Sequence, residues 1–471
     1  MVHFGTSGWR GVIGRDITFR KVRQVTQAIL DTVLPKDDRQ HEVIVGYDTR
    51  MLSEKFARSA AALIAGNGVK VRLPERDIPS PVLSSAILER GADAGIIFTA
   101  SHNPPEYNGL KLYTRDGILA PTEVTDPVEA RYRELEADWD DVFLPQPNRI
   151  TSCDPKPAYI ERFAELIDWE AIRASGLTVV VDPLFGTSRE YLDHILMEHG
   201  VPVTVIHNTR DPFFGGYAPE CTSENLTRLR DVMRQTGADL GLATDGDGDR
   251  FGILDHGARL KESNLALALV LDYLARRRGL RGRVGRTLAT SLLVEAVARH
   301  HGLEIIETPV GFKNFGPLLV EGSLEFAAEE SAGLAWSRHL PERDGILACF
   351  LVTEMVAVEG RTMYELGQDL FRRVGTYHFR RTQVPLTRQL EQVLERRFQQ
   401  EIDQVDGLEV VATDRRDGLK LSFANGGWLL IRKAGTEPKV RIYAEGRTKE
   451  EMRHLLHLAK KLLSNWRLSD V

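Results

Sequence analysis

The sequence predicts an α/β protein with three similar α/β domains followed by a smaller C-terminal α+β domain. Two observations predict this organisation. A strand–helix–strand pattern recurs three times, and the last part of the chain changes to two-residue alternation of apolar and polar side chains. The length of 471 residues agrees with three or four domains of about 100 to 200 residues each.

The repeat joins a short apolar strand to an amphipathic helix, a glycine-ended turn and a second strand. Such alternation predicts βαβ units, in which helices cover parallel strands, so we expect mixed and mostly parallel sheets. The expected strand, helix and strand of each copy are 42–45, 53–65 and 69–73; 177–181, 188–198 and 201–206; and 287–291, a helix to His300, and 303–307.

The C-terminal region follows a different pattern, because apolar and polar residues alternate within its segments. Alternation predicts antiparallel strands, here at 419–422, 428–432 and 440–444, with a closing helix at 449–466 packed on them. The expected linkers are 144–157, 256–260 and 374–378. The predicted domains are 1–146, 155–256, 257–373 and 376–471.

Composition restricts the functional classes. With 61 basic and 67 acidic residues the net charge is −6, which disfavours nucleic acid as a partner. The arginine-rich run 276–283 follows a predicted helix, whose C-terminal end favours cations. Cys153, Cys221 and Cys349 form no metal-binding spacing and indicate free thiols in a reducing compartment. Because no apolar run reaches about 18 to 20 residues, we expect a cytoplasmic protein with no membrane partner.

A serine lies at the mouth of a predicted functional loop. The segment Thr99–Lys111 follows a buried-strand pattern at 94–98, and loops at the carboxyl ends of such strands commonly carry function. Ser101 is near its start, His102 is beside it, and Lys111 is on the next short strand. A hydroxyl placed this way can act as a nucleophile when a neighbouring base takes its proton. An ordinary polar turn is the alternative.

Three carboxylates at alternate positions follow another predicted buried strand. Glycines separate Asp245, Asp247 and Asp249 and let the backbone curl, so the side chains can converge on one hard cation. Carboxylate-only ligation favours Mg²⁺ over zinc. An EF-hand requires glycine at loop position 6 and glutamate at position 12, where this chain has Arg250 and His256. The alternative of a solvated turn would leave three like charges unneutralised.

Two more segments carry polar groups suited to ligands. The segment Arg432–Arg441 offers basic side chains, backbone N–H groups near Gly435 and the Thr436 hydroxyl, which together can form a phosphate cradle. A basic surface hairpin explains it equally well. No Gly-Lys dipeptide occurs, which excludes a Walker A loop. Glu329 and Ser331 lie between apolar flanks and could bind the vicinal hydroxyls of a sugar, although a capped helix start is the alternative.

Five segments, taken together in this order, carry a family resemblance: Phe4–Arg10, Thr99–Pro104, Asp245–Arg250, Glu329–Ser331 and Arg432–Arg441. They resemble the α-D-phosphohexomutase family, which is the phosphoglucomutase and phosphomannomutase superfamily. The resemblance covers essentially the whole chain. It implies four domains around a central cleft, the first three sharing one α/β fold, and the activity of an intramolecular phosphotransferase.

The resemblance also implies roles for individual residues. Phosphorylated Ser101 would complete a Mg²⁺ shell begun by Asp245, Asp247 and Asp249, and glucose 1,6-bisphosphate would act as activator. Arg10, His102 and Lys111 would surround the transferring phosphoryl group, with His102 or Lys111 as general acid and base. The residues expected to contact the substrate are Arg250, Thr308, Gly311, Glu329, Ser331, Arg432, Gly435 and Thr436.

The chain departs from the family pattern at two loops. The phosphate loop commonly reads Arg-Pro-Ser-Gly-Thr-Glu-Pro, but here Lys433 and Ala434 replace Pro and Ser. The lost hydroxyl would cost on the order of 1 to 3 kcal/mol of phosphate binding unless Lys433 compensates. Ala328 and Ala332 stand where glycines are usual, and the Glu-Glu-Ser sequence is more similar to glucose-preferring members.

The leading hypothesis is a mutase that interconverts hexose 1-phosphate and hexose 6-phosphate through a phosphoserine and a bound 1,6-bisphosphate. Glucose is the first expected substrate and mannose the second. The alternatives are a serine- and Mg²⁺-dependent sugar phosphatase, a mutase for another sugar such as glucosamine phosphate, and a non-catalytic sugar-phosphate binding protein. The expected partners are small hexose phosphates, and a monomer or a homodimer is expected.

Overall fold

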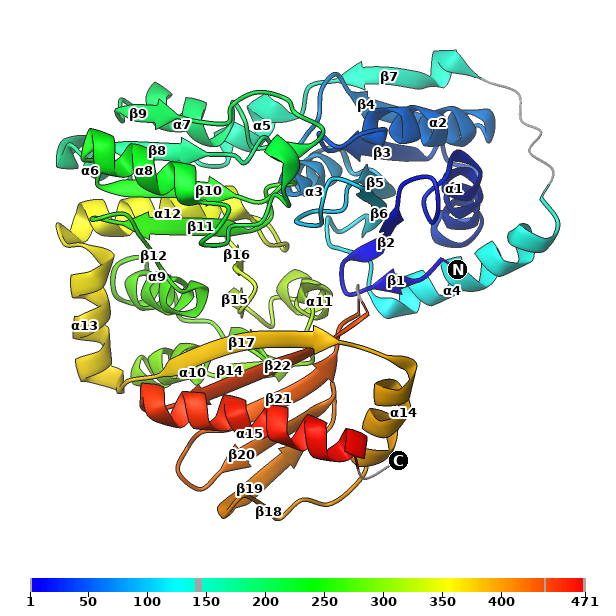
Figure 1. Ribbon diagram of the computed structural model, residues 1–471. Coiled ribbons are helices and arrows are strands. Elements are labelled where there is room, and N and C mark those ends of the chain that lie inside the picture. Colours follow the sequence, from blue (N-terminus) through cyan, green and yellow to red (C-terminus); the bar gives the residue numbers. More distant parts are fainter. Residues whose placement is uncertain (1, 140–145, 436–437, 469–471) are drawn as a thin grey trace.

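The computed structural model describes residues 2–139, 146–435 and 438–468. Four sheets follow one another along the chain, and helices cover each of them (Figure 1). The first two sheets lie side by side at the top of Figure 1, and the fourth lies at the bottom beneath the third. The predicted fold class is confirmed: three mixed α/β units precede a C-terminal unit with an antiparallel sheet.

The first sheet has seven strands in the order β1-β2-β6-β5-β3-β4-β7. Its strands are β1 (Phe4–Gly5), β2 (Gly8–Val12), β3 (Glu42–Tyr47), β4 (Lys70–Pro74), β5 (Ala94–Phe98), β6 (Tyr107–Thr114) and β7 (Ile150–Cys153). β3 pairs in parallel with β4 and β5, and β6 pairs antiparallel with β5. Its helices are α1 (Phe19–Val33), α2 (Ser53–Gly66), α3 (Ser80–Arg90) and α4 (Thr122–Ala137).

The second sheet has five strands and the third has four, in the orders β12-β11-β10-β8-β9 and β14-β13-β15-β16. Their strands are β8 (Val179–Asp182), β9 (Val203–Val205), β10 (Leu240–Thr244), β11 (Phe251–Asp255), β12 (Arg259–Leu260), β13 (Val284–Thr287), β14 (Ile305–Thr308), β15 (Phe326–Glu329) and β16 (Gly333–Trp336). The longer helices here are α6 (Trp169–Ser175), α7 (Leu192–Glu198), α8 (Thr227–Thr236), α9 (Ser263–Arg277), α10 (Leu292–His300), α12 (Gly345–Glu359) and α13 (Met363–Val374).

One feature shared by the first three sheets positions the site. In each sheet a strand within the parallel part continues into an antiparallel neighbour: β5 into β6, β10 into β11, and β15 into β16. The connections between these strands are 99–106, 245–250 and 330–332. The serine loop, the aspartate loop and part of the Glu-Glu-Ser segment therefore occupy the same topological position in three successive domains.

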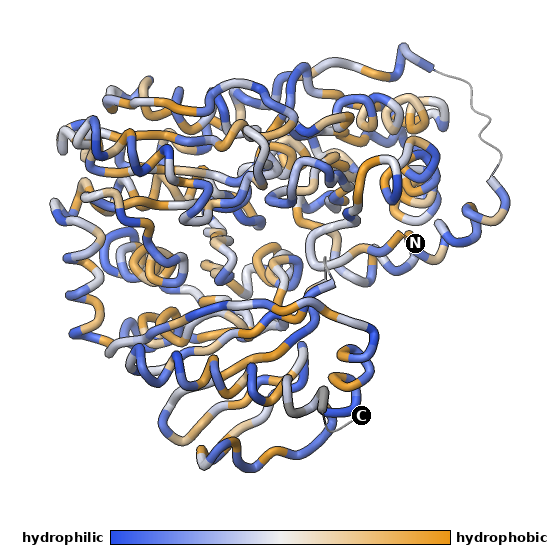
Figure 2. The backbone as a smooth tube through the Cα atoms, viewed as in Figure 1, coloured by the Kyte–Doolittle hydropathy of each residue, from blue (hydrophilic) through white to orange (hydrophobic). Residues whose placement is uncertain are grey.

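The fourth domain is an antiparallel sheet in the order β17-β22-β21-β20-β19-β18. Its elements are β17 (His378–Pro385), α14 (Arg388–Arg397), β18 (Gln404–Val405), β19 (Leu408–Asp414), β20 (Leu419–Phe423), β21 (Trp428–Lys433), β22 (Lys439–Gly446) and α15 (Lys449–Leu468). Hydrophobic and hydrophilic residues alternate in patches along α15 (Figure 2). Leu455, Leu458 and Leu463 are buried, which explains why the helix packs on β21 and β22 as predicted.

Several element boundaries differ from the sequence prediction. The strand expected at 287–291 ends at Thr287, because Ser291 instead caps α10 by accepting a hydrogen bond from the backbone of Leu293. The helix expected at 188–198 begins at Leu192, because Glu190 has φ +62 and cannot continue an α-helix. Two expected linkers also contain strands, since β7 pairs with β4 and β12 pairs with β11.

Two further expectations concern the arginine-rich run 276–283 and membrane-spanning helices. Three arginines of this run pair with acidic residues of α12: Arg276 and Arg277 pair with Glu359, and Arg278 pairs with Glu354. The run lies at the C-terminal end of α9, as the sequence predicts. Within the described residues, no helix combines the length and apolar character needed to cross a membrane.

Candidate active site

The serine loop is held by a buried charge. Ser101 has φ +52, a backbone conformation that residues other than glycine rarely adopt. The guanidinium of Arg50, which pairs with Asp48, donates hydrogen bonds to the backbone oxygens of Ser101, Asn103 and Pro104. These contacts stabilise a strained loop conformation, and such strain is often found at functional sites.

The loop brings the serine to the aspartate cluster. Oγ of Ser101 donates a hydrogen bond of 2.7 Å to Oδ2 of Asp245, across the boundary between the first two sheets. One carboxylate oxygen from each of Asp245, Asp247 and Asp249 lies within 4.8 Å of the others. Oδ1 of Asp247 and Oδ1 of Asp249 are buried and accept no hydrogen bond from the described residues. A cation also lies near one of them, since Nε of Arg250 is 3.8 Å from Oδ1 of Asp249. Buried carboxylate oxygens that accept no hydrogen bond from the described residues and have this spacing fit Mg²⁺, which prefers oxygen ligands.

Lys111 lies against the same carboxylates. On β6, its Nζ is 2.5 Å from Oδ2 of Asp247 and also donates a hydrogen bond to Oδ2 of Asp249. Ser80, at the start of α3, donates to the same oxygen of Asp247 over 2.6 Å. The ammonium therefore neutralises one side of the cluster and leaves the two Oδ1 atoms open to a cation.

The three carboxylates have different electrostatic surroundings. Burial and the neighbouring charges of Asp249 and Asp247 raise the pKa of Asp245 to about 8. Although burial opposes it, the cations of Arg343 and Lys111 hold the pKa of Asp249 far below its usual range. The cluster therefore combines one carboxyl that keeps its proton near neutral pH with one that is permanently ionised.

Arg10 and His102 lie beside this cluster. Nη1 of Arg10 donates to Oδ1 of Asn103 over 2.8 Å, while its Nε and Nη2 are buried without a hydrogen-bond partner among the described residues. Nδ1 of His102 is likewise buried and unpartnered in that part of the chain. Burial, together with the charges of Arg250 and Arg10, lowers the pKa of His102 well below its ordinary value. His102 is therefore neutral at physiological pH and able to accept a proton.

The Glu-Glu-Ser segment is joined to the aspartate cluster by an arginine that the sequence analysis missed. Arg343 donates from Nη2 to Oδ2 of Asp249 over 2.9 Å, and its Nη1 is 3.3 Å from Oε2 of Glu329. Ser331 donates to that same oxygen of Glu329 over 2.7 Å. Arg343 precedes the N-cap of α12, and no spacing or motif in the sequence distinguishes it.

A cavity of about 410 Å³ opens beside these residues. Asp245, Arg250 and Ser331 line it, so it joins the metal loop to the third-domain hairpin. The other charged lining residues are Glu220, Lys261, Glu262, Glu330, Arg380 and Arg381. The two arginines come from β17, so the fourth domain closes one side of a cleft that the second and third domains begin.

The sugar loop and the phosphate loop converge on the N-terminal segment. A Cβ atom added at Gly311 would lie 3.4 Å from Cγ2 of Thr6, and a Cβ atom added at Gly435 would also lie 3.4 Å from it. Thr308 is at the end of β14, where its hydroxyl donates to the backbone oxygen of Pro309 over 3.1 Å. Thr436, expected to contact the substrate, lies outside the described residues.

The first two basic residues of the phosphate loop are already paired. Arg432 donates from Nε to Oδ2 of Asp417 over 3.0 Å. Lys433 points away from the loop: its Nζ lies 3.2 Å from Glu391 and 3.0 Å from Glu395, both on α14. In this structure the ammonium of Lys433 is paired with the carboxylates of α14, so compensation for the missing serine hydroxyl by Lys433 stays a prediction.

Comparisons with known proteins agree with this architecture. Family sequence models for the phosphoglucomutase/phosphomannomutase alpha/beta/alpha domains I, II and III match residues 1–138, 157–258 and 262–374, and the model of the C-terminal domain matches 389–461. A phosphoglucomutase/phosphomannomutase of Thermococcus kodakarensis is 30% identical over 98% of both chains. A candidate phosphoglucosamine mutase of Methanothermobacter thermautotrophicus is 32% identical over 98% of both chains.

A solved structure gives the same result. The crystal structure of a candidate phosphomannomutase from Thermus thermophilus is 30% identical, with a TM-score of 0.84, over 98% of this chain and 99% of that chain. The two relatives and the solved structure each cover 98% of the chain, and the four domain models match successive ranges from residue 1 to residue 461. The chain therefore belongs to the phosphoglucomutase/phosphomannomutase family of phosphohexomutases.

Proposed function

We propose that the chain interconverts hexose 1-phosphate and hexose 6-phosphate, with glucose as the preferred sugar and mannose as a second substrate. One observation carries the proposal: Oγ of Ser101 lies 2.7 Å from Oδ2 of Asp245, in a cluster whose other two carboxylates each have an oxygen that accepts no hydrogen bond from the described residues. A phosphate on Ser101 would place its oxygens at the aspartate loop, where a phosphoryl group can be held and its charge neutralised.

In this proposal the ligands of Mg²⁺ are Asp245, Asp247 and Asp249 together with Ser101. When bound there, Mg²⁺ supplies charge neutralisation for the phosphoryl oxygens. Nε and Nη2 of Arg10, which have no partner within the described ranges, are available to the same oxygens from β2 of the first sheet. Arg250, which lines the cavity, is positioned to contact a substrate that enters the cleft.

The proposed reaction moves one phosphoryl group in each half. The 6-hydroxyl of a hexose 1-phosphate attacks the phosphorus on Ser101, so the P–O6 bond forms as the P–Oγ bond breaks. Neutral His102 takes the hydroxyl proton, and Lys111 protonates the departing serine oxygen. The 1,6-bisphosphate then turns end for end, and transfer of its 1-phosphate back to Ser101 releases the 6-phosphate.

Recognition of the rest of the substrate is assigned to three segments. Glu329 and Ser331 hold the sugar hydroxyls, while Thr308 and Gly311 belong to the loop that reads the ring. The group that is not transferred is gripped by the loop containing Arg432, Gly435 and Thr436. The convergence of Gly311 and Gly435 on Thr6 supports this division, because it brings the two loops to one side of the cleft.

Phosphorus NMR tests the proposal directly. The purified protein is incubated with Mg²⁺, a trace of glucose 1,6-bisphosphate and excess glucose 1-phosphate, and the spectrum is followed over time. We expect a growing resonance of glucose 6-phosphate. Release of orthophosphate without the 6-phosphate would instead support a phosphatase, and an unchanged spectrum would exclude glucose as substrate.

A second candidate sugar is glucosamine. Besides Asp245, three carboxylates line the cavity, those of Glu220, Glu262 and Glu330, and each could accept a hydrogen bond from the ammonium group of an amino sugar. Candidate phosphoglucosamine mutases are also among the relatives that match the full length of the chain. Competition between glucose 1-phosphate and glucosamine 1-phosphate in one NMR sample distinguishes the two, because each 6-phosphate product has its own resonance.

A further inference from the structure

We propose that Asp417 is a positioning residue that holds the ring-reading loop 308–313 and the phosphate-loop residue Arg432 together as one unit. The inference rests on the proposed function, because it concerns the two loops assigned to substrate recognition. Asp417 lies outside every segment that the sequence analysis singled out, in the connection between β19 and β20.

One carboxylate oxygen of Asp417 contacts both loops. Oδ2 of Asp417 accepts a hydrogen bond of 3.1 Å from the backbone N–H of Val310. The same atom accepts a hydrogen bond of 3.0 Å from Nε of Arg432 and lies 2.9 Å from Nη2 of that guanidinium. Val310 belongs to the third domain, whereas Asp417 and Arg432 belong to the fourth. The oxygen therefore joins the two recognition loops across a domain boundary.

The backbone next to Asp417 supports this placement. Gly418 has φ +94, and a side chain there would lie 2.4 Å from the backbone oxygen of Ile431 and 2.8 Å from Cβ of Arg432. Only glycine lets the β19–β20 turn approach β21 this closely. The carboxylate of Asp417 is thus delivered to Arg432 by the course of the chain, and its side chain is largely buried, with 22% exposed.

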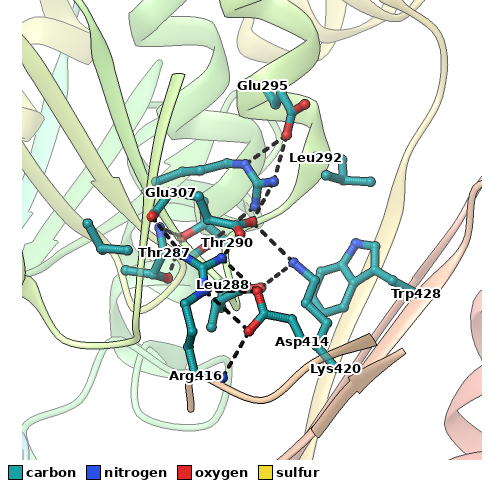
Figure 3. Close-up of polar contacts among 12 residues, drawn as sticks. Thr287, Leu288, Thr290, Leu292, Glu295, Glu307, Asp414, Arg416, Lys420 and Trp428 are labelled. Carbon is teal, nitrogen blue, oxygen red and sulfur yellow. Dashed lines mark hydrogen bonds and ion pairs between the residues drawn. The ribbon is translucent and has the colours of Figure 1, made fainter. Parts of the chain in front are cut away.

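A second carboxylate fixes the start of the same loop. Glu307, the residue before Thr308, lies 2.7 Å from Nη2 of Arg286 in its own domain and 3.4 Å from Nζ of Lys420 in the fourth domain. Arg416 of the fourth domain also pairs with it. Figure 3 shows Glu307 with Arg416 and Lys420 beside it. The loop therefore leaves β14 already attached to the fourth domain.

The carboxylates of Glu307 and Asp417 hold different parts of the loop. Glu307 anchors the base of the loop through several cations, so loss of one contact leaves others. Asp417 makes a single connection within the loop itself, between the backbone that reads the ring and the guanidinium that grips the phosphate. If the fourth domain moves when a substrate enters, Asp417 keeps Val310 and Arg432 at a constant separation. The distance between the ring contacts and the phosphate contact is thereby fixed.

The test compares Asp417→Ala, Asp417→Asn and the matched control Asp406→Asn in the full-length chain. Asp406 lies between β18 and β19 of the fourth domain and its carboxylate pairs with Lys461 of α15, so its substitution removes the same charge without touching Val310, Arg432 or the cations around Glu307. Hydrogen exchange of the backbone at 308–313 reports the loop contact independently of catalysis. Steady-state kinetics with glucose 1-phosphate and with mannose 1-phosphate report recognition.

We expect faster exchange at 308–313 in Asp417→Ala, and exchange close to that of the unaltered chain in Asp417→Asn, whose amide oxygen still accepts from Val310. Both variants should raise KM about tenfold with little change in kcat, because charge-assisted contacts to Arg432 are lost while the phosphoryl site is untouched. The ratio of kcat/KM between the two sugars should also fall in Asp417→Ala. Asp406→Asn should change none of these quantities.

The possible failures can be told apart. If hydrogen exchange at 308–313 and KM in Asp417→Ala equal those of Asp406→Asn, the positioning role is overturned. If the unaltered chain turns over neither sugar phosphate, the proposed function fails, but the exchange data still decide whether Asp417 holds the loop. If Asp417→Ala does not fold, KM of Asp417→Asn tests the proposal instead. A KM equal to that of the unaltered chain would overturn the positioning role.

Discussion

Arg343 donates a hydrogen bond from Nη2 to Oδ2 of Asp249 over 2.9 Å, although the two residues are 94 positions apart in the chain. Because Nη1 of the same guanidinium is 3.3 Å from Glu329, a single cation connects the aspartate cluster to the Glu-Glu-Ser segment. Both carboxylates are buried, and Arg343 compensates the charge of Glu329 while it shares the compensation of Asp249 with Lys111.

Replacement of Arg343 by Gln should destabilise the metal-free protein by about 3 to 5 kcal/mol, since it leaves the buried carboxylate of Glu329 without its cation and removes one of the cations that compensate Asp249. Mg²⁺ should restore part of this loss, because a cation at the aspartate loop neutralises Asp249 in another way. Thermal unfolding with and without Mg²⁺ measures both effects. The control Arg338→Gln alters an exposed arginine that pairs with Glu325 and should have little effect. An equal loss of stability with and without Mg²⁺ would contradict the prediction.

The features that could be predicted from the sequence are those formed by residues close together in the chain. The serine loop and the aspartate loop were recognisable because each is a short segment after an apolar strand, and the structure places both in the β-hairpin connections of their sheets. The antiparallel C-terminal sheet was also predicted, because alternation of side chains is a local property. The domain boundaries stay a prediction.

Pairings between distant segments could not be predicted. Arg343 and Asp417 act through partners that are 94 and 107 positions away, and neither lies in a motif. The direction of Lys433 also depended on tertiary structure, because only the packing of α14 beside β21 brings Glu391 and Glu395 to it. In sequence alone, Lys433 was one more basic residue in a basic loop.

Replacement of Ser101 by Ala should lower kcat by at least about a thousand-fold, because it removes the atom that carries the phosphoryl group. The fold should be retained, since the variant loses only the hydrogen bonds of one hydroxyl. Phosphorus NMR measures turnover, and intact-mass spectrometry tests for a covalent phosphate, which should be absent. Ser152→Ala, on the edge strand β7, is the matched control and should keep full activity. Near-normal turnover by Ser101→Ala would refute the phosphoserine mechanism.

Magnesium affinity should depend steeply on pH because of Asp245. With its pKa raised to about 8 by burial and by the charges of Asp249 and Asp247, this carboxyl holds a proton in the metal-free folded state at neutral pH. Mg²⁺ must displace that proton, so affinity should rise about tenfold per pH unit from pH 6 and level off near pH 8. Titration calorimetry in buffers of different ionisation enthalpy counts the proton released.

The carboxyl of Asp245 should also make the stability of the metal-free protein depend on pH. Between the pKa of an unfolded aspartate and about 8, the folded chain binds a proton that the unfolded chain releases, so the contribution of Asp245 to stability falls as pH rises through this interval. Asp245→Asn should remove this pH dependence from the metal-free protein. A magnesium affinity that is flat from pH 6 to 8 would show that Asp245 is already ionised.

The phosphate loop offers a gain-of-function prediction, because Ala434 occupies a position where the family commonly has serine. A hydroxyl at this position would add a donor to the phosphate site, and a hydrogen bond to a charged group contributes about 1.5 to 3 kcal/mol. Ala434→Ser should therefore lower KM for hexose phosphates by on the order of tenfold, while kcat changes little. Steady-state kinetics on the unaltered chain and the variant measure this effect.

Lys433→Ala is the matched comparison, since it changes the adjacent residue. Because Nζ of Lys433 lies near Glu391 and Glu395 on α14, its loss should leave KM unchanged and lower stability by less than about 1 kcal/mol, as for other half-exposed ion pairs. A rise in KM in Lys433→Ala would mean that the ammonium leaves α14 and reaches the substrate phosphate when the cleft is occupied. The two variants together therefore separate a site that lacks a hydroxyl from one in which a lysine has replaced it.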